Sequence, residues 1–176
     1  MPLRGLCCLR DNADLKRHFV PMALNPYYAN IFIDSCAFDP KYEPEASAAE
    51  EIFRRHQRQE ISLVVAHSNM KEAEHSNTPK HVKRAALSQI FTFETDLVHT
   101  ERLKKQEIWD VLTRNGKPEK MKQDAEHVFE AHKYGGYFVT TDERILKLRS
   151  KLHQVSDAHI VRPSELISLL EEHNAS

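Results

Sequence analysis

The sequence predicts a three-layer α/β/α fold with a central, mostly parallel sheet of four to five strands. Short apolar runs recur along the chain, and stretches with helical periodicity separate them. This alternation favours parallel strands in one sheet, with helices packed on both of its faces. Ligands of such sheets bind beyond the carboxyl ends of the strands, so functional residues are expected there.

The first predicted elements follow an N-terminal extension of uncertain structure, residues 1–28, which shows no clear period. Ala29–Ile33 is a short apolar run that predicts a buried strand. Glu45–Gln59 carries apolar residues along one stripe at helical spacing and is predicted to be a helix. Ile61–Ala66 is rich in β-branched residues, which predicts a second buried strand, and a short helix is expected from about Asn69.

The middle of the chain is predicted to contain a third strand, with one helix before it and one helix after it. Thr78 and Pro79 resemble the N-cap and first residue of a helix that runs to Leu87. The third strand is expected at Ile90–Phe93. Thr100–Leu112 is the next predicted helix, because Asn115-Gly116 is a typical end signal.

The last predicted elements complete a single domain over residues 29–171, with a C-terminal tail at 172–176. A helix at Glu119–Lys133 is expected to end at Gly135-Gly136. The remaining elements are a strand at Tyr137–Thr140, a helix at Glu143–Leu152, a strand at His159–Arg162 and a terminal helix from Pro163.

Composition is typical of a globular protein of 176 residues, with 40% hydrophobic and 29% charged residues. No apolar run reaches the ~18 residues of a membrane span, and no leader is recognised, so a cytoplasmic protein without a membrane partner is expected. Three cysteines, two of them adjacent, do not indicate a disulfide framework or a zinc site. The net charge of −1 gives no general support to nucleic-acid binding, although a local basic patch would suffice.

Acidic residues lie at the predicted carboxyl ends of the strands. Asp34 ends the first strand, Asp142 lies two residues beyond the fourth, and Glu72 falls in the first turn after the second. Asp124 lies in line with apolar residues such as Val128 on the helix before the fourth strand, which points its carboxylate toward the sheet. All four acids are therefore expected at one end of the sheet.

Four converging carboxylates would repel one another unless a cation lay among them. Mg²⁺ and Mn²⁺ prefer carboxylate and water oxygens as ligands. Water on such an ion becomes a better nucleophile, and the ion stabilises charge that develops on a phosphate. The four acids therefore predict a metal-dependent phosphodiesterase that needs no nucleophilic side chain.

Each of these acids also has a structural explanation. Asp34 could begin a turn, and Glu72 could pair with Asn69 in a capping box. Asp124 could be a solvated charge on its helix, and Asp142 could cap the helix that follows it. The functional interpretation therefore depends on all four occupying the same end of one sheet.

Three stretches of the chain are similar to the motifs of one nuclease family. IFIDSCAF contains Asp34 and Ser35, SLVVAHSNMKEAEH contains Glu72, and DAEHVFEAHKYGGYFVTTDERI contains Asp124, Thr140 and Asp142. In these stretches, and over about Ala29 to Leu170, the chain resembles the PIN-domain nucleases, which include the toxin ribonucleases of bacterial toxin–antitoxin systems.

The resemblance implies a Rossmann-like sheet, Mg²⁺ or Mn²⁺ at the four acids, cleavage of RNA, and frequent homodimers. For a toxin it also implies an antitoxin protein as partner. Ser35 and Thr140 would orient carboxylates or a phosphate. The chain departs from the family at Cys36, where Asn is most common, and Glu74 is a rival to Glu72 for the second acid. Asp39 and Glu143 are expected to be solvated.

A basic cluster is the candidate contact for RNA phosphates: Lys71, Lys80, Lys83 and Arg84. These residues flank the helix after the second strand and could equally form a solvated helix face. Arg102, Lys104 and Lys105 form a second and weaker candidate.

Three other functions stay open. A phosphatase of the haloacid dehalogenase type would need a second Asp where Cys36 stands. A PIN-like module that binds RNA or protein without catalysis would not need all four acids. A DNA-directed nuclease of the same superfamily usually carries helical insertions for which the chain has little room.

Overall fold

The computed structural model describes residues 24–65, 90–91, 96–114 and 118–175. The described strands are β1 (Asn30–Ile33), β2 (Ser62–Val65), β3 (Ile90–Phe91), β4 (Gly136–Val139) and β5 (His159–Val161). The described helices are the 3₁₀ helix η1 (Ser35–Ala37), α1 (Glu45–Gln57), α4 (His99–Thr113), α5 (Pro118–Lys133), α6 (Glu143–Leu146), α7 (Arg149–Val155) and α8 (Pro163–Asn174).

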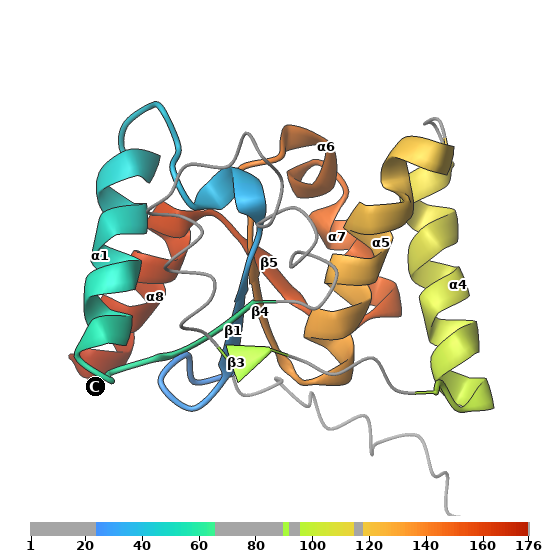
Figure 1. Ribbon diagram of the computed structural model, residues 1–176, viewed down its shortest axis with the longest axis horizontal. Coiled ribbons are helices and arrows are strands. Elements are labelled where there is room, and N and C mark those ends of the chain that lie inside the picture. Colours follow the sequence, from blue (N-terminus) through green and yellow to red (C-terminus); the bar gives the residue numbers. More distant parts are fainter. Residues whose placement is uncertain (1–23, 66–89, 92–95, 115–117, 176) are drawn as a thin grey trace, which may run out of the picture.

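The five strands form one sheet in the order β3-β2-β1-β4-β5, and each neighbouring pair is parallel. Because the strands are parallel, the carboxyl ends of β1 and β4 lie at the same edge. The chain continues there into η1 after β1 and into α6 after β4, both at the top of Figure 1. The predicted three-layer fold with a parallel sheet is confirmed.

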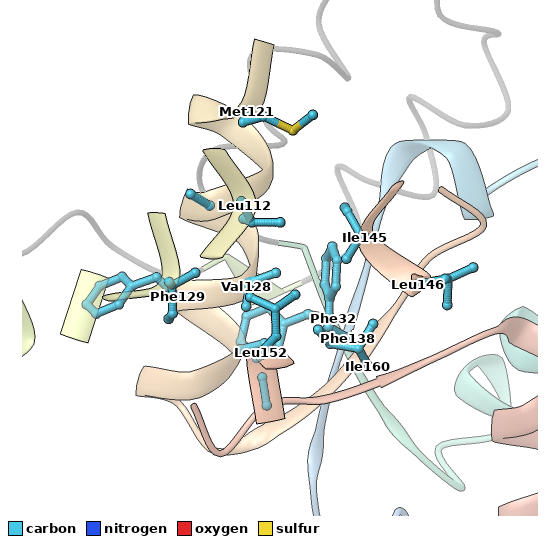
Figure 2. Close-up of a cluster of buried hydrophobic side chains, with 14 of the residues drawn as sticks. Phe32, Leu112, Met121, Val128, Phe129, Phe138, Ile145, Leu146, Leu152 and Ile160 are labelled. Carbon is cyan, nitrogen blue, oxygen red and sulfur yellow. The ribbon is translucent and has the colours of Figure 1, made fainter. Parts of the chain in front are cut away.

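Alternating side chains of the strands divide the core into two layers. Ile31, Leu63 and Tyr137 pack in the layer under α1 and α8, on the left of Figure 1. Phe32 is opposite Val64 on β2 and opposite Phe138 on β4. These three residues pack on the other face with residues of α4, α5, α6 and α7, and Figure 2 shows Phe32 and Phe138 at the centre of that cluster.

Two glycines make the close approach of β1 and β4 possible. Gly135 has a φ of +62°, in the left-handed region that glycine adopts without strain, and it turns the chain from α5 into β4. A Cβ on Gly136 would lie 2.0 Å from the backbone oxygen of Asn30, its partner on β1. The side chain of Asn30 also donates to the Tyr134 oxygen at 3.0 Å. These contacts hold α5 and β4 in register with β1.

The predicted helix at Glu143–Leu152 is wrong, because the chain forms α6 and α7 there instead of one helix. The Leu148 N–H donates to the Ile145 oxygen at 2.9 Å, and Leu148 has φ −98° and ψ −2°, which interrupts the α-helical pattern. The interruption allows Ile145 and Leu152, which lie on different helices, to be buried in the same cluster (Figure 2).

Other element ends differ from the predictions by small amounts. The fourth strand begins at Gly136 and ends before Thr140, and the terminal helix continues to Asn174, inside the expected tail. Within the expected N-terminal extension, the Tyr27 hydroxyl donates to the Leu170 oxygen at 3.1 Å. The helices expected from Asn69 and at Thr78–Leu87 lie outside the described residues. No described helix combines the length and apolar character of a membrane span.

Candidate active site

Asp34 is held at the carboxyl end of β1 by contacts with the end of β4. Its backbone N–H donates to the Val139 oxygen at 2.9 Å, and its carboxylate is nearly buried. The fully buried Thr140 hydroxyl donates to Asp34 Oδ2 at 2.7 Å. The Cys36 thiol donates to the same oxygen at 3.1 Å. Because both hydrogen bonds use Oδ2, the carboxylate has a fixed orientation.

Thr140 also connects the first acid to the last one. Its hydroxyl oxygen accepts a hydrogen bond from the Asp142 N–H at 3.0 Å while it donates to Asp34. The Asp142 carboxylate then caps α6, because its Oδ1 accepts from the Arg144 N–H at 2.7 Å. The orienting contact expected of Thr140 is present, and Asp142 also performs the capping that was its structural alternative.

Asp124 approaches the same place from α5, on the face that packs against the sheet. Its neighbours Val128 and Ala131 on that face are completely buried, as the spacing predicted. The Arg144 side chain reaches it, with Nη2 3.5 Å from Asp124 Oδ2, while Arg144 Nε contacts both carboxylate oxygens of Asp142 at 3.0 and 3.1 Å. The structure therefore brings Asp124 and Asp142 together around one guanidinium group.

Asp124 is the least satisfied of these acids. Its Oδ2 atom is buried and has no hydrogen-bond partner among the described residues. Burial raises the pKa of Asp124 above its ordinary value; the positive charge of Arg144 opposes this rise, and the negative charges of Asp34 and Asp142 add to it. The arrangement therefore places a carboxylate that Arg144 compensates only in part close to two other carboxylates.

Asp142 and Arg144 are in the opposite electrostatic situation. Burial acts to raise the pKa of Asp142, but hydrogen bonds from the Arg144 side chain and backbone outweigh it and lower the pKa. The same side-chain hydrogen bond raises the pKa of Arg144, with smaller contributions from the charges of Asp142, Asp124 and Asp34. Arg144 thus responds to all three aspartates of the predicted site.

His127 is a further residue at this site that the sequence motifs did not single out. It lies one turn after Asp124 on α5 and is 2% exposed. Its Nδ1 atom is 3.8 Å from Asp34 Oδ1, and neither ring nitrogen has a hydrogen-bond partner among the described residues. The signal was present in the sequence, since position 127 follows Asp124 at the helical spacing of the buried face.

Cys36, and not Ser35, makes the contact with Asp34 that the family resemblance implied for Ser35. The Ser35 side chain is exposed and, within the described residues, makes no hydrogen bond to Asp34, so its expected orienting contact is not seen here. Cys36 contacts Asp34 instead, and its sulfur is 3.3 Å from the Thr140 hydroxyl. Burial, together with the charge of Asp34, raises the pKa of the Cys36 thiol to about 11, so it stays protonated as a donor.

The remaining candidates either lie outside the described residues or pair elsewhere. The second acid and its rival, Glu72 and Glu74, lie outside the described residues, as do the basic candidates Lys71, Lys80, Lys83 and Arg84. Asp39 pairs with Lys41, and Glu143 pairs with Arg162. Lys104 and Lys105 on α4 pair with Glu107 at 2.6 Å and Glu126 at 3.6 Å. Asp39 and Glu143 are therefore exposed and ion-paired, in line with their expected solvation.

In the side-chain arrangement observed here, no group of three or more His, Cys, Asp or Glu residues within the described ranges is arranged to hold a metal ion. Arg144 stands between two of the three aspartates, and the predicted second acid is not among the described residues.

Comparisons of the chain with protein-family models, curated proteins and solved structures find no match. The geometry of the acids is therefore the main basis for a functional proposal.

Proposed function

We propose that this chain is a PIN-like endoribonuclease that uses Mg²⁺ or Mn²⁺ to hydrolyse RNA. The observation that carries the proposal is the meeting of Asp34, Asp124 and Asp142 at the carboxyl edge of a parallel sheet, with Thr140 bonded to two of them. The resemblance of the surrounding motifs to PIN-domain nucleases supports it, and ligand binding at this edge is the rule for such sheets.

The chemistry of the donors fits the proposed ion. Carboxylate oxygens are the ligands that Mg²⁺ and Mn²⁺ prefer, and Asp124 offers a buried oxygen without a hydrogen-bond donor in the described part of the chain. Asp34, Asp124 and Asp142 would hold the ion directly or through water, with Glu72 as the fourth proposed ligand. When bound, the ion supplies an activated water and stabilises charge on the phosphate.

The protein's own contribution is to hold the acids in place. Thr140 and Cys36 both donate to Asp34 Oδ2 and so keep Oδ1 directed away from them, on the side of His127. Thr140 simultaneously fixes the backbone of Asp142. Groups that orient ligands in this way typically change metal affinity or activity by about 10-fold to 100-fold.

The proposed partners follow from the same resemblance. RNA is the proposed substrate, with Lys71, Lys80, Lys83 and Arg84 as proposed phosphate contacts. A homodimer and an antitoxin protein are further proposals, and an antitoxin would be encoded as a small separate protein. The homodimer and the antitoxin would matter for regulation rather than for the hydrolysis itself.

The first test is cleavage of a mixed-sequence single-stranded RNA by the full chain, with Mn²⁺, with Mg²⁺ and with EDTA. Asp34→Asn and Asp142→Asn should each reduce metal-dependent cleavage more than about 100-fold, because a ligand to the ion is lost. Glu143→Gln is the matched control: it removes the acid next to Asp142, which pairs with Arg162 at the surface, and should cleave like the unmodified protein.

Calorimetric titration with Mn²⁺ accompanies the cleavage assay. Tight binding that both aspartate variants lose would support the metal site even if the chosen RNA were not a substrate. Absence of both cleavage and Mn²⁺ binding in the unmodified protein would overturn the proposal and favour a non-catalytic binding module.

A further inference from the structure

Arg144 occupies the position between two of the proposed metal ligands. Its guanidinium Nε lies 3.0 and 3.1 Å from the two oxygens of Asp142, and its Nη2 contacts Asp142 Oδ2 and lies 3.5 Å from Asp124 Oδ2. The two acids come from different elements, α5 and the loop after β4. A single positive group therefore joins them.

The other arginines of this region pair differently. Arg149 contacts both oxygens of Glu165 at 2.8 and 3.0 Å, and Arg162 contacts Glu143. These are exposed pairs between one arginine and one acid. Arg144 instead turns back over the N-terminus of α6 toward two acids, one of which has a buried oxygen with no hydrogen-bond donor in the described part of the chain.

The Arg144 side chain is exposed, although its backbone is held in place. Its N–H donates to Asp142 Oδ1 at 2.7 Å, whereas its side chain is 52% exposed. The guanidinium could thus move by side-chain rotation while α6 keeps its N-cap. A positive group that is anchored at the backbone and exposed at its tip is suited to being replaced by another cation.

We propose that Arg144 is an exchangeable counter-ion, which competes with the divalent ion for Asp124 and Asp142 and, once displaced, binds a phosphate of the RNA substrate. This inference rests on the proposed function. A guanidinium and a metal ion cannot both occupy the space between the two carboxylates. The displaced guanidinium stays tethered beside the site, and its planar set of donors matches phosphate oxygens.

The test compares Arg144→Gln with the unmodified protein and with a control variant, Arg149→Gln. Arg149 lies five residues after Arg144, and this substitution breaks its surface pair with Glu165. Mn²⁺ affinity is measured by calorimetry without RNA. Arg144→Gln should bind Mn²⁺ roughly fivefold to tenfold more tightly, because the competing cation is gone. At saturating Mn²⁺ the same variant should cleave RNA about 10-fold to 100-fold more slowly, because the phosphate contact is lost. Arg149→Gln should match the unmodified protein in both assays.

Arg144→Lys provides the second variant, since it keeps the charge but not the planar guanidinium. It should retain most of the competition with Mn²⁺ and still cleave more slowly than the unmodified protein. Thermal unfolding in EDTA shows whether each variant is folded before its affinity is compared.

Three results would overturn the inference while leaving the nuclease proposal intact. Unchanged Mn²⁺ affinity in Arg144→Gln would show that no competition exists, and weaker affinity would show that Arg144 positions the acids for the ion. Tighter Mn²⁺ binding with unchanged cleavage would remove the phosphate role. If neither the unmodified protein nor Arg144→Gln binds Mn²⁺, the proposed function itself fails and the inference fails with it.

Discussion

Two carboxylates on opposite sides of the sheet show how differently the chain treats a buried acid. Glu45, on α1, is 3% exposed and accepts hydrogen bonds from the Ser164 N–H at 3.0 Å and the Ser164 hydroxyl at 2.8 Å. Asp124, on α5, has a buried oxygen with no hydrogen-bond partner among the described residues and only a distant ion pair with Arg144.

The difference separates a structural acid, Glu45, from an acid of the proposed metal site, Asp124. Glu45 caps α8, whose N-cap residue Arg162 has no acceptor in its side chain, and so joins α8 to α1. Asp124 provides no comparable connection and lies beside other negative charges. A buried polar group that the fold leaves unsatisfied calls for an explanation outside folding, and the proposed metal binding would supply one.

The largest change in stability is expected when the satisfied acid of this pair, Glu45, is replaced. Glu45→Ala should destabilise the protein by about 3 kcal/mol, because two donors of Ser164 at the start of α8 lose their acceptor in a buried place. Urea unfolding measures the loss. Glu43→Ala is the matched control: Glu43 also accepts from a serine, with the Ser47 hydroxyl at 2.7 Å, but at an exposed position. Equal losses in the two variants would show that the buried cap has no special role.

Much of the site was predictable because strand ends and helix spacing are local properties. Asp34 follows a largely apolar strand, and Thr140 and Asp142 follow another, so the parallel topology was enough to bring them to one edge. Asp124 was predicted to face the sheet from its spacing to Val128, and that prediction is confirmed. The identity of the fold class required only the alternation of strands and helices.

The features that the sequence did not predict depend on contacts between residues distant in sequence. The Glu45 cap on α8 joins positions 119 residues apart, which no local pattern reports. The direction of the Arg144 side chain depends on where α5 places Asp124, and the break between α6 and α7 depends on how the core accepts Ile145 and Leu152. The burial of His127 was not predicted, because a histidine is compatible with both surface and core, and packing decides between them.

A second, smaller effect is expected at the buried histidine next to Asp124. His127→Leu should stabilise the protein by roughly 1 kcal/mol, because both ring nitrogens are buried without a hydrogen-bond partner in the described part of the chain. His132→Leu, on the same helix, is the control with the opposite sign, because His132 Nδ1 accepts from the Asp157 N–H at 3.1 Å. Destabilisation of both variants to the same extent would indicate that His127 contributes to folding after all.

The smallest change in the free energy of unfolding is expected at Asp124 itself, when it is measured without added metal. Asp124→Asn should raise the free energy of unfolding at pH 7 by on the order of 0.5 kcal/mol, because it removes a poorly satisfied charge. The folded-state pKa of Asp124 is raised, so the unmodified protein binds this proton more tightly when folded. Its stability therefore falls as pH rises from the ordinary Asp pKa through the raised one, and the advantage of the variant grows over that interval.

Urea unfolding in EDTA measures the difference in unfolding free energy between the two proteins. The measurement is made at about pH 3.5 and about pH 7, conditions chosen near and above the ordinary Asp pKa. Added Mn²⁺ should then reverse the order, since an ion that binds only the folded state stabilises the unmodified protein in proportion to its occupancy. A loss of stability in Asp124→Asn at both pH values would place Asp124 with Glu45 among the structural acids. The reversal by Mn²⁺ would instead show that the fold tolerates an unfavourable carboxylate because a cation completes it.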